Sequence, residues 1–248
     1  MTVAVDLVVP IKELRRAKSR LVGATVALVP APQRSAAHAS LALALAADTL
    51  AAVLASAVRR VAVVTSDPRA AALVRPAGHD GGGHHSPDLS RTVVVDDPGA
   101  GLNAAVRAGV EHLQRFPDGL TGHAPAPVAA LLGDLPALRA AELDQALARA
   151  VAVIADGAPA AYVADHTGEG TTMLVLARPG HGGPHFGPRS AHAHAAAGAV
   201  ALPDAWPGLR HDVDVPADLE RVRALGVGPA TRAWPDAAVP AVPLAGCR

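Results

Sequence analysis

Cysteine and aromatic residues are scarce in this chain of 248 residues. Aromatic side chains make up 2% of the sequence although 50% of it is hydrophobic, so a core must be built from Ala, Val and Leu. The one cysteine, Cys247, excludes an intramolecular disulfide and a cluster of thiolate metal ligands within one chain. A formal net charge of zero provides no general attraction to nucleic acid or to an anionic membrane, so neither is expected as a partner and any anion site must be local.

Several motifs that mark particular chemistries are missing as well. There is no GxxxxGKS/T loop, no GxGxxG after the first apolar run, no HExxH and no GxSxG. These absences argue against a P-loop, a dinucleotide-binding Rossmann domain, a zinc hydrolase and a serine nucleophile. His192 and His194 are two residues apart, a spacing that does not align them on a helix, so they do not support a metal site.

Signals for export and for membrane insertion are not apparent. The stretch MTVAVDLVVPIKELRRAKSRL places its apolar run before its basic residues, the reverse order of a signal peptide, and indicates a first strand. No apolar stretch reaches the roughly 20 uninterrupted residues of a spanning helix. The Ala/Leu-rich segment 35–56 contains His38 and Asp48 and predicts a buried helix. A cytoplasmic protein is therefore expected.

Short apolar runs alternate with helical patterns along the first part of the chain. The runs cover residues 3–9, 60–66, 92–97 and 128–134. The helical patterns cover about 33–57, 101–115 and 138–152. This alternation predicts an α/β fold with a mostly parallel sheet covered on both faces, which binds ligands beyond the carboxyl ends of its strands. The later stretch 160–177 predicts a hairpin joined by a Gly-rich turn.

Three aspartates follow predicted strands. Asp134 comes after the apolar run in LLGDLPAL, and Asp212 and Asp214 alternate with valines in HDVDVPADL. Residues i and i+2 of a strand face the same way, so the last two carboxylates are expected side by side. Carboxylates suit Mg²⁺ bound together with substrate phosphates, and a cation would make the adjacent like charges tolerable. An ordinary turn or cap aspartate is the alternative for Asp134.

Two further segments have both a functional and an ordinary interpretation. PIKELRRAKSRL places Lys12, Lys18 and Arg20 just after the first strand, where they could neutralise a triphosphate or simply face solvent on a helix. DDPGAGLNAAV offers Gly101 and Asn103, either as a recognition loop for a nucleobase or as a tight strand-to-helix turn.

The second half of the chain contains two possible oxyanion sites. GTTML offers Thr171 and its neighbour Thr172 on the predicted hairpin, and FGPRS offers Gly187 and Ser190 at the start of a short helix. Backbone N–H groups and hydroxyls of such segments can bind an oxyanion, although each segment could also be an ordinary turn. Reasoning from the residues alone leaves both alternatives open.

Six of these segments, in chain order, resemble a known family. VPIKELRRAKSRL, DDPGAGLNAAV, LLGDLPAL, GTTML, FGPRSAHAH and HDVDVPADL are similar to the guanylyltransferases of deazaflavin coenzyme F(420) biosynthesis, called CofC in archaea and FbiD in mycobacteria. The resemblance covers about residues 3–230. It implies a Rossmann-like nucleotidyltransferase fold of the glycosyltransferase-A type with an added hairpin region, in a single domain over 1–233. Residues 234–248 are expected to form a disordered tail.

The resemblance also implies an activity. The family joins GMP from GTP to a three-carbon phosphate and releases pyrophosphate. The sequences of the GPRS and HDVDVPADL segments look like those of the actinobacterial branch of the family. This resemblance favours phosphoenolpyruvate as acceptor over 2-phospho-L-lactate or 3-phosphoglycerate. A nucleotidyltransferase acting on a sugar phosphate or molybdopterin, and a catalytically silent nucleotide-binding protein, are the rival hypotheses. A downstream transferase of the same pathway is a further expected partner, as acceptor of an unstable product.

Residue roles follow in part from the resemblance and in part from position and chemistry. The resemblance implies Mg²⁺ ligands at Asp134, Asp212 and Asp214, and phosphoenolpyruvate contacts at Thr171, Gly187 and Ser190. Position and chemistry assign the GTP phosphates to Lys12, Lys18 and Arg20, and the guanine end to Gly101 and Asn103. Lys18 and Asp134 are the expected catalytic residues.

Overall fold

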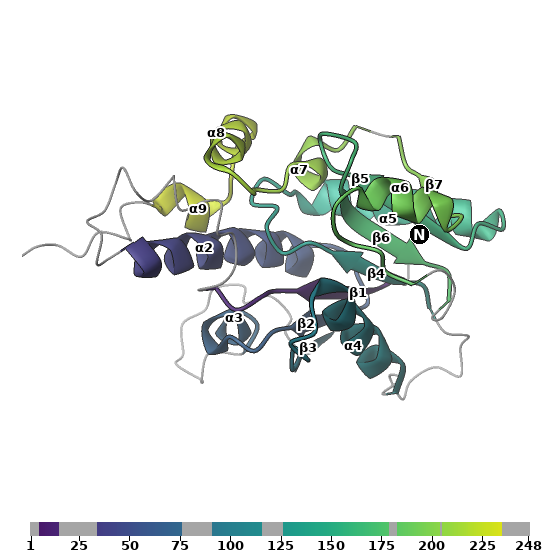
Figure 1. The fold of residues 1–248 in the computed structure, drawn as a ribbon, viewed down its shortest axis with the longest axis horizontal. Helices are drawn as coiled ribbons and strands as arrows, with labels where there is room; N and C mark the ends of the chain where they lie inside the picture. The colour runs from purple at the N-terminus through teal and green to yellow at the C-terminus, as the bar shows by residue number, and fades with distance from the viewer. Residues whose placement is uncertain are drawn as a thin grey trace, which may run out of the picture.

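The computed structural model describes residues 5–14, 34–75, 91–115, 126–178, 183–203 and 205–234. Within them one sheet has the strand order β3-β2-β1-β4-β6-β5-β7 (Figure 1). Its strands are β1 Asp6–Pro10, β2 Arg60–Val64, β3 Thr92–Val95, β4 Val128–Leu131, β5 Ala160–Ala164, β6 Thr171–Leu176 and β7 Val200–Ala201. Only β6 runs against its neighbours β4 and β5, while the other pairs are parallel. The predicted parallel sheet and the predicted hairpin, formed by β5 and β6, are confirmed.

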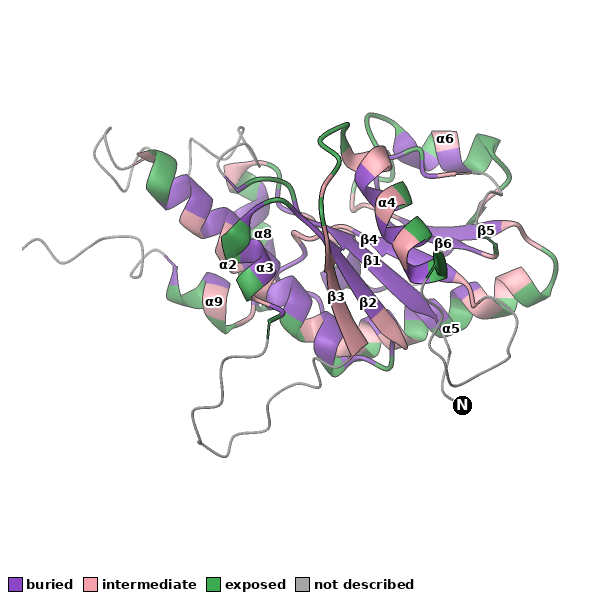
Figure 2. Ribbon diagram, turned by 90° about the horizontal axis from the view of Figure 1, so that it is seen from below, coloured by how far each residue is buried: buried purple, intermediate pink, exposed green. Residues whose placement is uncertain are grey.

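Helices cover both faces of this sheet, as the alternation predicts. The helices of the described residues are α2 Arg34–Ala55, α3 Pro68–Ala72, α4 Leu102–Arg115, α5 Ala140–Ala155, α6 Ser190–Ala196, α7 Pro207–Arg210, α8 Pro216–Leu225 and α9 Pro229–Ala233. Leu7 and Val9 of β1 pack in a cluster with α2 and α5, whereas Val8 packs in another with α4 and α6. The central strands are buried on both faces (Figure 2), and for this reason they appear in the sequence as continuous apolar runs.

Small residues let the layers approach closely. A Cβ atom on Gly109 of α4 would lie 2.5 Å from a methyl carbon of Val8, well inside van der Waals contact. The helix therefore lies nearer to β1 than a larger residue would permit. Such close contacts suit a core that contains few large rings.

A third cluster joins the C-terminal helices to α2. Leu41 and Leu45 pack there against Val222 of α8 and against Trp234, which is 2% exposed. Trp234 follows the short α9 and packs on an apolar surface of α2, and the expected division into a domain and a tail stays a prediction. Residues 235–248 lie outside the described residues, as does the Gly- and His-rich segment 77–88.

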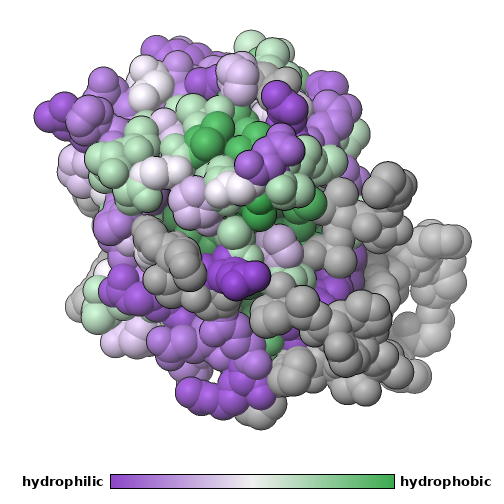
Figure 3. Space-filling view, turned by 90° about the vertical axis from the view of Figure 1, so that its right-hand side faces the viewer, coloured by the Kyte–Doolittle hydropathy of each residue, from purple (hydrophilic) through white to green (hydrophobic). Residues whose placement is uncertain are grey.

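Helix α2 is long and apolar enough to cross a membrane by length and composition, but 67% of its most apolar window is buried inside the protein. It is the core helix that the sequence predicts. Figure 3 shows the face at the right-hand side of Figure 1, where hydrophobic residues form small areas among hydrophilic ones. Among the described residues, Val200 is the one large hydrophobic side chain that is exposed.

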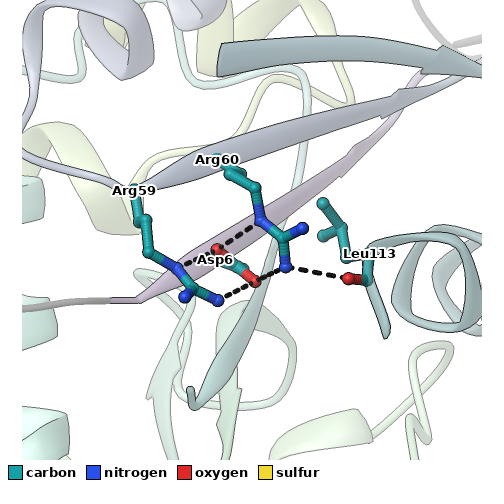
Figure 4. A network of polar contacts seen from close by, with 4 residues as sticks. All are labelled: Asp6, Arg59, Arg60 and Leu113. Carbon is teal, nitrogen blue, oxygen red and sulfur yellow. Dashed lines mark hydrogen bonds and ion pairs between the residues drawn. The ribbon is translucent and has the colours of Figure 1, made fainter. Parts of the chain in front are cut away.

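An ion-pair network holds the amino end of β1 (Figure 4). Asp6 is 2% exposed, and its two carboxylate oxygens accept hydrogen bonds from the guanidinium groups of Arg59, at 2.7 and 2.8 Å, and of Arg60. Arg60 also donates to the carbonyl oxygen of Leu113 at 2.8 Å, near the end of α4. Bidentate pairing with two cations compensates the buried carboxylate. The network lies at the opposite end of β1 from Pro10.

Candidate active site

A cleft lies where the winding of the sheet changes direction. From β1 the chain goes outward to β2 and β3, and then returns to form β4 on the other side of β1. Ligand sites of open α/β sheets lie beyond the strand ends at such a point. The cleft has a volume of about 670 Å³, and its lining includes residues after β1 and after β4, the turn between β5 and β6, residues 186–190, Asp212 and Asp214.

The three aspartates expected to act together meet in this cleft. Asp134, Asp212 and Asp214 each offer a carboxylate oxygen, and these oxygens lie within 4.8 Å of one another. The backbone N–H of Val213 donates to the carbonyl oxygen of Asp134 at 3.2 Å and joins the two segments. The Val213 side chain is fully buried in the cluster with Leu219 and Val222. Asp212 and Asp214 on either side of it therefore reach the cleft.

The expected strand over the DVD segment was wrong. Residues 211–214 lie outside the sheet, between α7 and α8. Their backbone N–H groups find partners elsewhere, because the Asp218 carboxylate accepts from the N–H groups of Asp214 at 3.0 Å and Val215 at 2.9 Å. The alternation of valine and aspartate therefore reflects the burial of Val213, which did not need a neighbouring strand.

The ends of β1 and β4 approach each other beside this cluster. A Cβ atom on Gly133 would lie 3.0 Å from a side-chain carbon of Ile11 and 3.3 Å from the carbonyl oxygen of Pro10. Glycine at this position lets the segment leading to Asp134 pass close to the end of β1. The carboxylate and Lys12 consequently line the same cleft.

The start of the basic segment is anchored by a buried carboxylate. The N–H of Leu14 donates to Asp67 Oδ2 at 3.1 Å, and Asp67 also caps α3 by accepting from the N–H of Arg69. The hydrogen bond from the Arg69 guanidinium, opposed by burial, lowers the pKa of Asp67 to about 2. Lys12 is exposed in the cleft, while Lys18 and Arg20 lie outside the described residues.

A β-bulge separates the two threonines that the sequence left equivalent. Val163 pairs with Met173, but the next residue, Ala164, pairs with Thr171, so Thr172 is an extra residue on β6. The bulge turns Thr171 to the side of α6, where its hydroxyl lies 2.9 Å from Nδ1 of His194. Thr171 lines the cleft, whereas Thr172 is fully buried and its hydroxyl lies 3.5 Å from the carbonyl oxygen of Val163.

The loop before α6 forms another wall of the cleft. Gly187 has a φ of 140° and lines the cleft together with Ser190, the buried first residue of α6. The Asn103 side chain bonds to both backbone groups of Phe186, accepting from N–H at 2.8 Å and donating to the carbonyl oxygen at 2.9 Å. Asn103 therefore holds this loop. Neither Asn103 nor Gly101 belongs to the cleft lining, and their contact with guanine stays a prediction.

Comparison with known proteins decides the family. No family model matches the chain. A phosphoenolpyruvate guanylyltransferase of Geodermatophilus obscurus is 48% identical over 229 residues, which cover 92% of each chain. One from Streptomyces coelicolor is 44% identical and one from Nocardia farcinica is 40% identical, covering 92% and 93% of this chain and 93% and 90% of theirs. This chain belongs to the phosphoenolpyruvate guanylyltransferase family.

Solved structures show which fold this member of the phosphoenolpyruvate guanylyltransferase family has. A nucleotidyl transferase from Methanothermobacter superposes with a TM-score of 0.52 at 18% identity, over 89% of this chain and 96% of its own. 4-Diphosphocytidyl-2C-methyl-D-erythritol synthase superposes with a TM-score of 0.53 at 15% identity, over 90% and 97%. The predicted nucleotidyltransferase fold is confirmed.

Several cleft residues of this guanylyltransferase family member were not among the predicted site residues. Asp165 and Glu169 lie in the turn between β5 and β6, and Arg189 lies in the loop before α6. Arg189 has a φ of 56°, uncommon for a residue other than glycine, and its side chain reaches within 4.0 Å of Glu169 at the exposed rim. His194 could have been found only from its packing, because the sequence pattern HAH does not indicate which histidine is buried.

Proposed function

We propose that this protein transfers GMP from GTP to phosphoenolpyruvate and releases pyrophosphate. The product would be enolpyruvyl-diphospho-5'-guanosine, an intermediate of coenzyme F(420) biosynthesis. Curated relatives at 40 to 48% identity carry the name of this activity. The observation that carries the proposal is the meeting of three carboxylates with Lys12 and Thr171 in one cleft.

The three carboxylates fit a divalent cation. Asp134, Asp212 and Asp214 supply hard oxygen ligands from two separate segments, and Mg²⁺ prefers carboxylate oxygens combined with substrate phosphates. We propose that they hold Mg²⁺. When bound, the cation would neutralise charge on the triphosphate and stabilise the charge that develops at the α-phosphate.

The chain's own residues would bring two anions together and hold them in line. A phosphate oxygen of phosphoenolpyruvate forms a bond to the α-phosphorus of GTP, the bond from that phosphorus to the bridging oxygen of the β-phosphate breaks, and pyrophosphate leaves. The acceptor oxygen is already anionic at neutral pH, so no protein nucleophile is needed. Positioning and charge neutralisation therefore supply the catalysis.

Each wall of the cleft has a proposed task. Lys12, Lys18 and Arg20 would neutralise the GTP phosphates, and Lys18 and Asp134 would be the catalytic residues. The acceptor would be bound by Thr171, Gly187 and Ser190. Gly101 and Asn103 would lie at the guanine end, where Asn103 keeps one amide hydrogen beyond the one it donates to Phe186.

The test is pyrophosphate release from GTP and Mg²⁺ with different acceptors in parallel. Phosphoenolpyruvate, 2-phospho-L-lactate and 3-phosphoglycerate are each supplied, and the guanylylated product is identified by mass spectrometry. We expect phosphoenolpyruvate to give the highest kcat/KM. Preference for another of the three would change the acceptor and leave the reaction class intact. A protein that binds GTP but releases no pyrophosphate with any of them would contradict the proposal.

The product would join an enol ester to a diphosphate and would be reactive. We propose that a downstream transferase in the cytoplasm takes it up as its donor substrate. Co-purification is not required for this relation, because a reactive diphosphate can be passed by diffusion over a short distance. Coupled assays with such a transferase would show whether product accumulates in its absence.

A further inference from the structure

A chain of hydrogen bonds runs from a backbone N–H group to the cleft. The N–H of His185 donates to Nε2 of His194 at 3.0 Å, and Nδ1 of the same ring lies 2.9 Å from Oγ1 of Thr171. His194 is 1% exposed and Thr171 is 3% exposed. Thr171 nevertheless contributes to the lining of the cleft.

The backbone N–H of His185 fixes which group donates in both hydrogen bonds. A backbone N–H can only donate, so Nε2 of His194 must accept and cannot carry a hydrogen. The hydrogen of the neutral ring is then on Nδ1, which donates to the Thr171 oxygen. Burial, followed by the nearby His185 imidazole, lowers the pKa of His194 to about 4, so the ring is neutral near pH 7.

Packing keeps the ring in this position. Its centroid lies 5.3 Å from that of Phe186, in an edge-on arrangement, and 6.0 Å from that of Tyr162. Phe186 is itself held by Asn103 through both of its backbone groups. The bulge at Thr172 aims Thr171 at the ring. The imidazole cannot turn over without losing both hydrogen bonds.

The hydroxyl hydrogen of Thr171 is not used in the bond with His194. Its oxygen accepts from His194, and the described residues offer its hydroxyl no other hydrogen-bond partner. The O–H is therefore available to donate into the cleft. A group that meets it there must be an acceptor, and an anionic oxygen accepts more strongly than a neutral one.

We propose that His194 is a positioning residue that fixes the Thr171 hydroxyl as a donor to a carboxylate or phosphate oxygen of the acceptor substrate. The inference rests on the proposed function, since it concerns how the phosphoenolpyruvate wall of the cleft recognises its ligand. A hydroxyl fixed as a donor makes this part of the cleft selective for oxygens that can only accept a hydrogen bond. His194 itself does not touch the substrate.

Two substitutions of His194 separate its two hydrogen bonds. In His194→Asn the amide nitrogen takes the place of Nδ1 and keeps the donor to Thr171. In His194→Gln the amide oxygen takes the place of Nε2, so it keeps the acceptor for the His185 N–H and removes the donor to Thr171. His192→Gln is the matched control, because His192 is an exposed residue on the same helix.

The measurement is the KM for phosphoenolpyruvate and for GTP, with Tm recorded for each variant. We expect His194→Gln to raise the KM for phosphoenolpyruvate about tenfold or more, the size expected when a hydrogen bond to a charged group is lost, with the KM for GTP within about twofold. His194→Asn should stay within about threefold of wild type. An equal rise in the KM for phosphoenolpyruvate in His194→Asn and His194→Gln would overturn the proposal. His194 would then only support the loop before α6.

A double variant tests whether His194 acts through the hydroxyl. Thr171→Val removes the hydroxyl at nearly constant shape, so adding His194→Gln to it should cost less than about twofold more. Full additivity of the two effects would overturn the proposal. If wild type releases pyrophosphate with phosphoenolpyruvate and these variants behave otherwise than expected, the positioning role fails while the proposed function stands.

The tautomer can be observed without any substitution. Nitrogen-15 NMR of the histidine rings distinguishes a protonated Nδ1 from a protonated Nε2, and His194→Asn or His194→Gln assigns the signal. We expect His194 at pH 7 to carry its hydrogen on Nδ1. Finding it on Nε2 would overturn the proposal even if no variant were active, and even if phosphoenolpyruvate were not the acceptor.

Discussion

Three carboxylates within a few ångströms of one another form the strongest chemical feature of the chain. We predict that Asp212→Asn, which keeps the shape of the side chain and removes its charge, lowers the rate of pyrophosphate release about 100-fold or more, equal to several kcal/mol of transition-state stabilisation. If the loss is one of metal affinity, excess Mg²⁺ should restore part of the rate. Glu220→Gln on the exposed side of α8 is the control. Wild-type activity of Asp212→Asn would contradict the metal assignment.

His194 makes the stability of the protein depend on pH. Its pKa is lowered to about 4 in the fold from 6.5. The unfolded chain therefore binds more protons between these values, and stability is present above pH 6.5 and is lost as the pH falls towards 4. Between pH 7 and pH 5 this group alone should cost about 2 kcal/mol.

Urea unfolding of wild type and His194→Gln at the two pH values isolates this contribution from that of the other titrating groups. The variant lacks the group, so its free energy of unfolding should fall about 2 kcal/mol less than that of wild type. The same pH dependence in both proteins would show that His194 is not held neutral in the fold.

At the scale of elements, the first turn of α8 positions part of the metal cluster. Asp218 is 6% exposed and accepts from the backbone N–H groups of Asp214 and Val215. We predict that Asp218→Ala lowers the free energy of unfolding by about 1 to 3 kcal/mol, because it leaves those donors without their partner. It should also raise the Mg²⁺ concentration needed for half-maximal activity several-fold, since Asp214 is no longer held.

Arg221→Met provides the comparison for this element. Arg221 pairs with Asp218 at 2.8 Å, but its side chain is 52% exposed, so removing it should cost well under about 1 kcal/mol. If Asp218→Ala is stable and its Mg²⁺ requirement is unchanged, the segment with Asp214 holds its position without the hydrogen bonds to the Asp218 carboxylate.

The elements that sequence predicts best are those whose signal is local. The expected helices over 33–57, 101–115 and 138–152 correspond to α2, α4 and α5 with ends that differ by at most a few residues, because apolar periodicity extends over several turns. The prediction of a strand over 211–215 is wrong, since alternation indicates which side chains are buried and does not indicate what the backbone bonds to.

Contacts between distant segments account for what could not be predicted. The contact of Asn103 with Phe186 could not be predicted, because Phe186 lies 83 residues further along the chain. The bulge that separates Thr171 from Thr172 depends on the pairing with β5, and neither threonine marks it in the sequence. Trp234 is buried because α9 ends against α2.

At the scale of the molecule, distant segments converge on the cleft and on the core. The cleft lining extends along the chain from Pro10 to Asp214. Asp48 of α2 accepts from the backbone N–H groups of Ala230 and Thr231 at 2.9 and 2.8 Å, which connects α9 to the core. We therefore propose that residues up to Trp234 fold as one unit. Unfolding followed by near-UV and far-UV signals should then give coincident transitions.

Because the walls of the cleft come together only in the folded chain, GTP and Mg²⁺ should bind the native state alone. At 100 times the dissociation constant such binding stabilises the fold by about 2.7 kcal/mol. For a chain of this size that corresponds to a rise in Tm of roughly 5 to 10 °C.

Thermal unfolding is measured with GTP and Mg²⁺, with GTP and a chelator, and with Asp212→Asn under both conditions. We expect wild type to lose most of the shift when the metal is chelated and the variant to show little metal-dependent shift. An equal shift with and without Mg²⁺ would mean that the carboxylates do not couple the metal to the nucleotide.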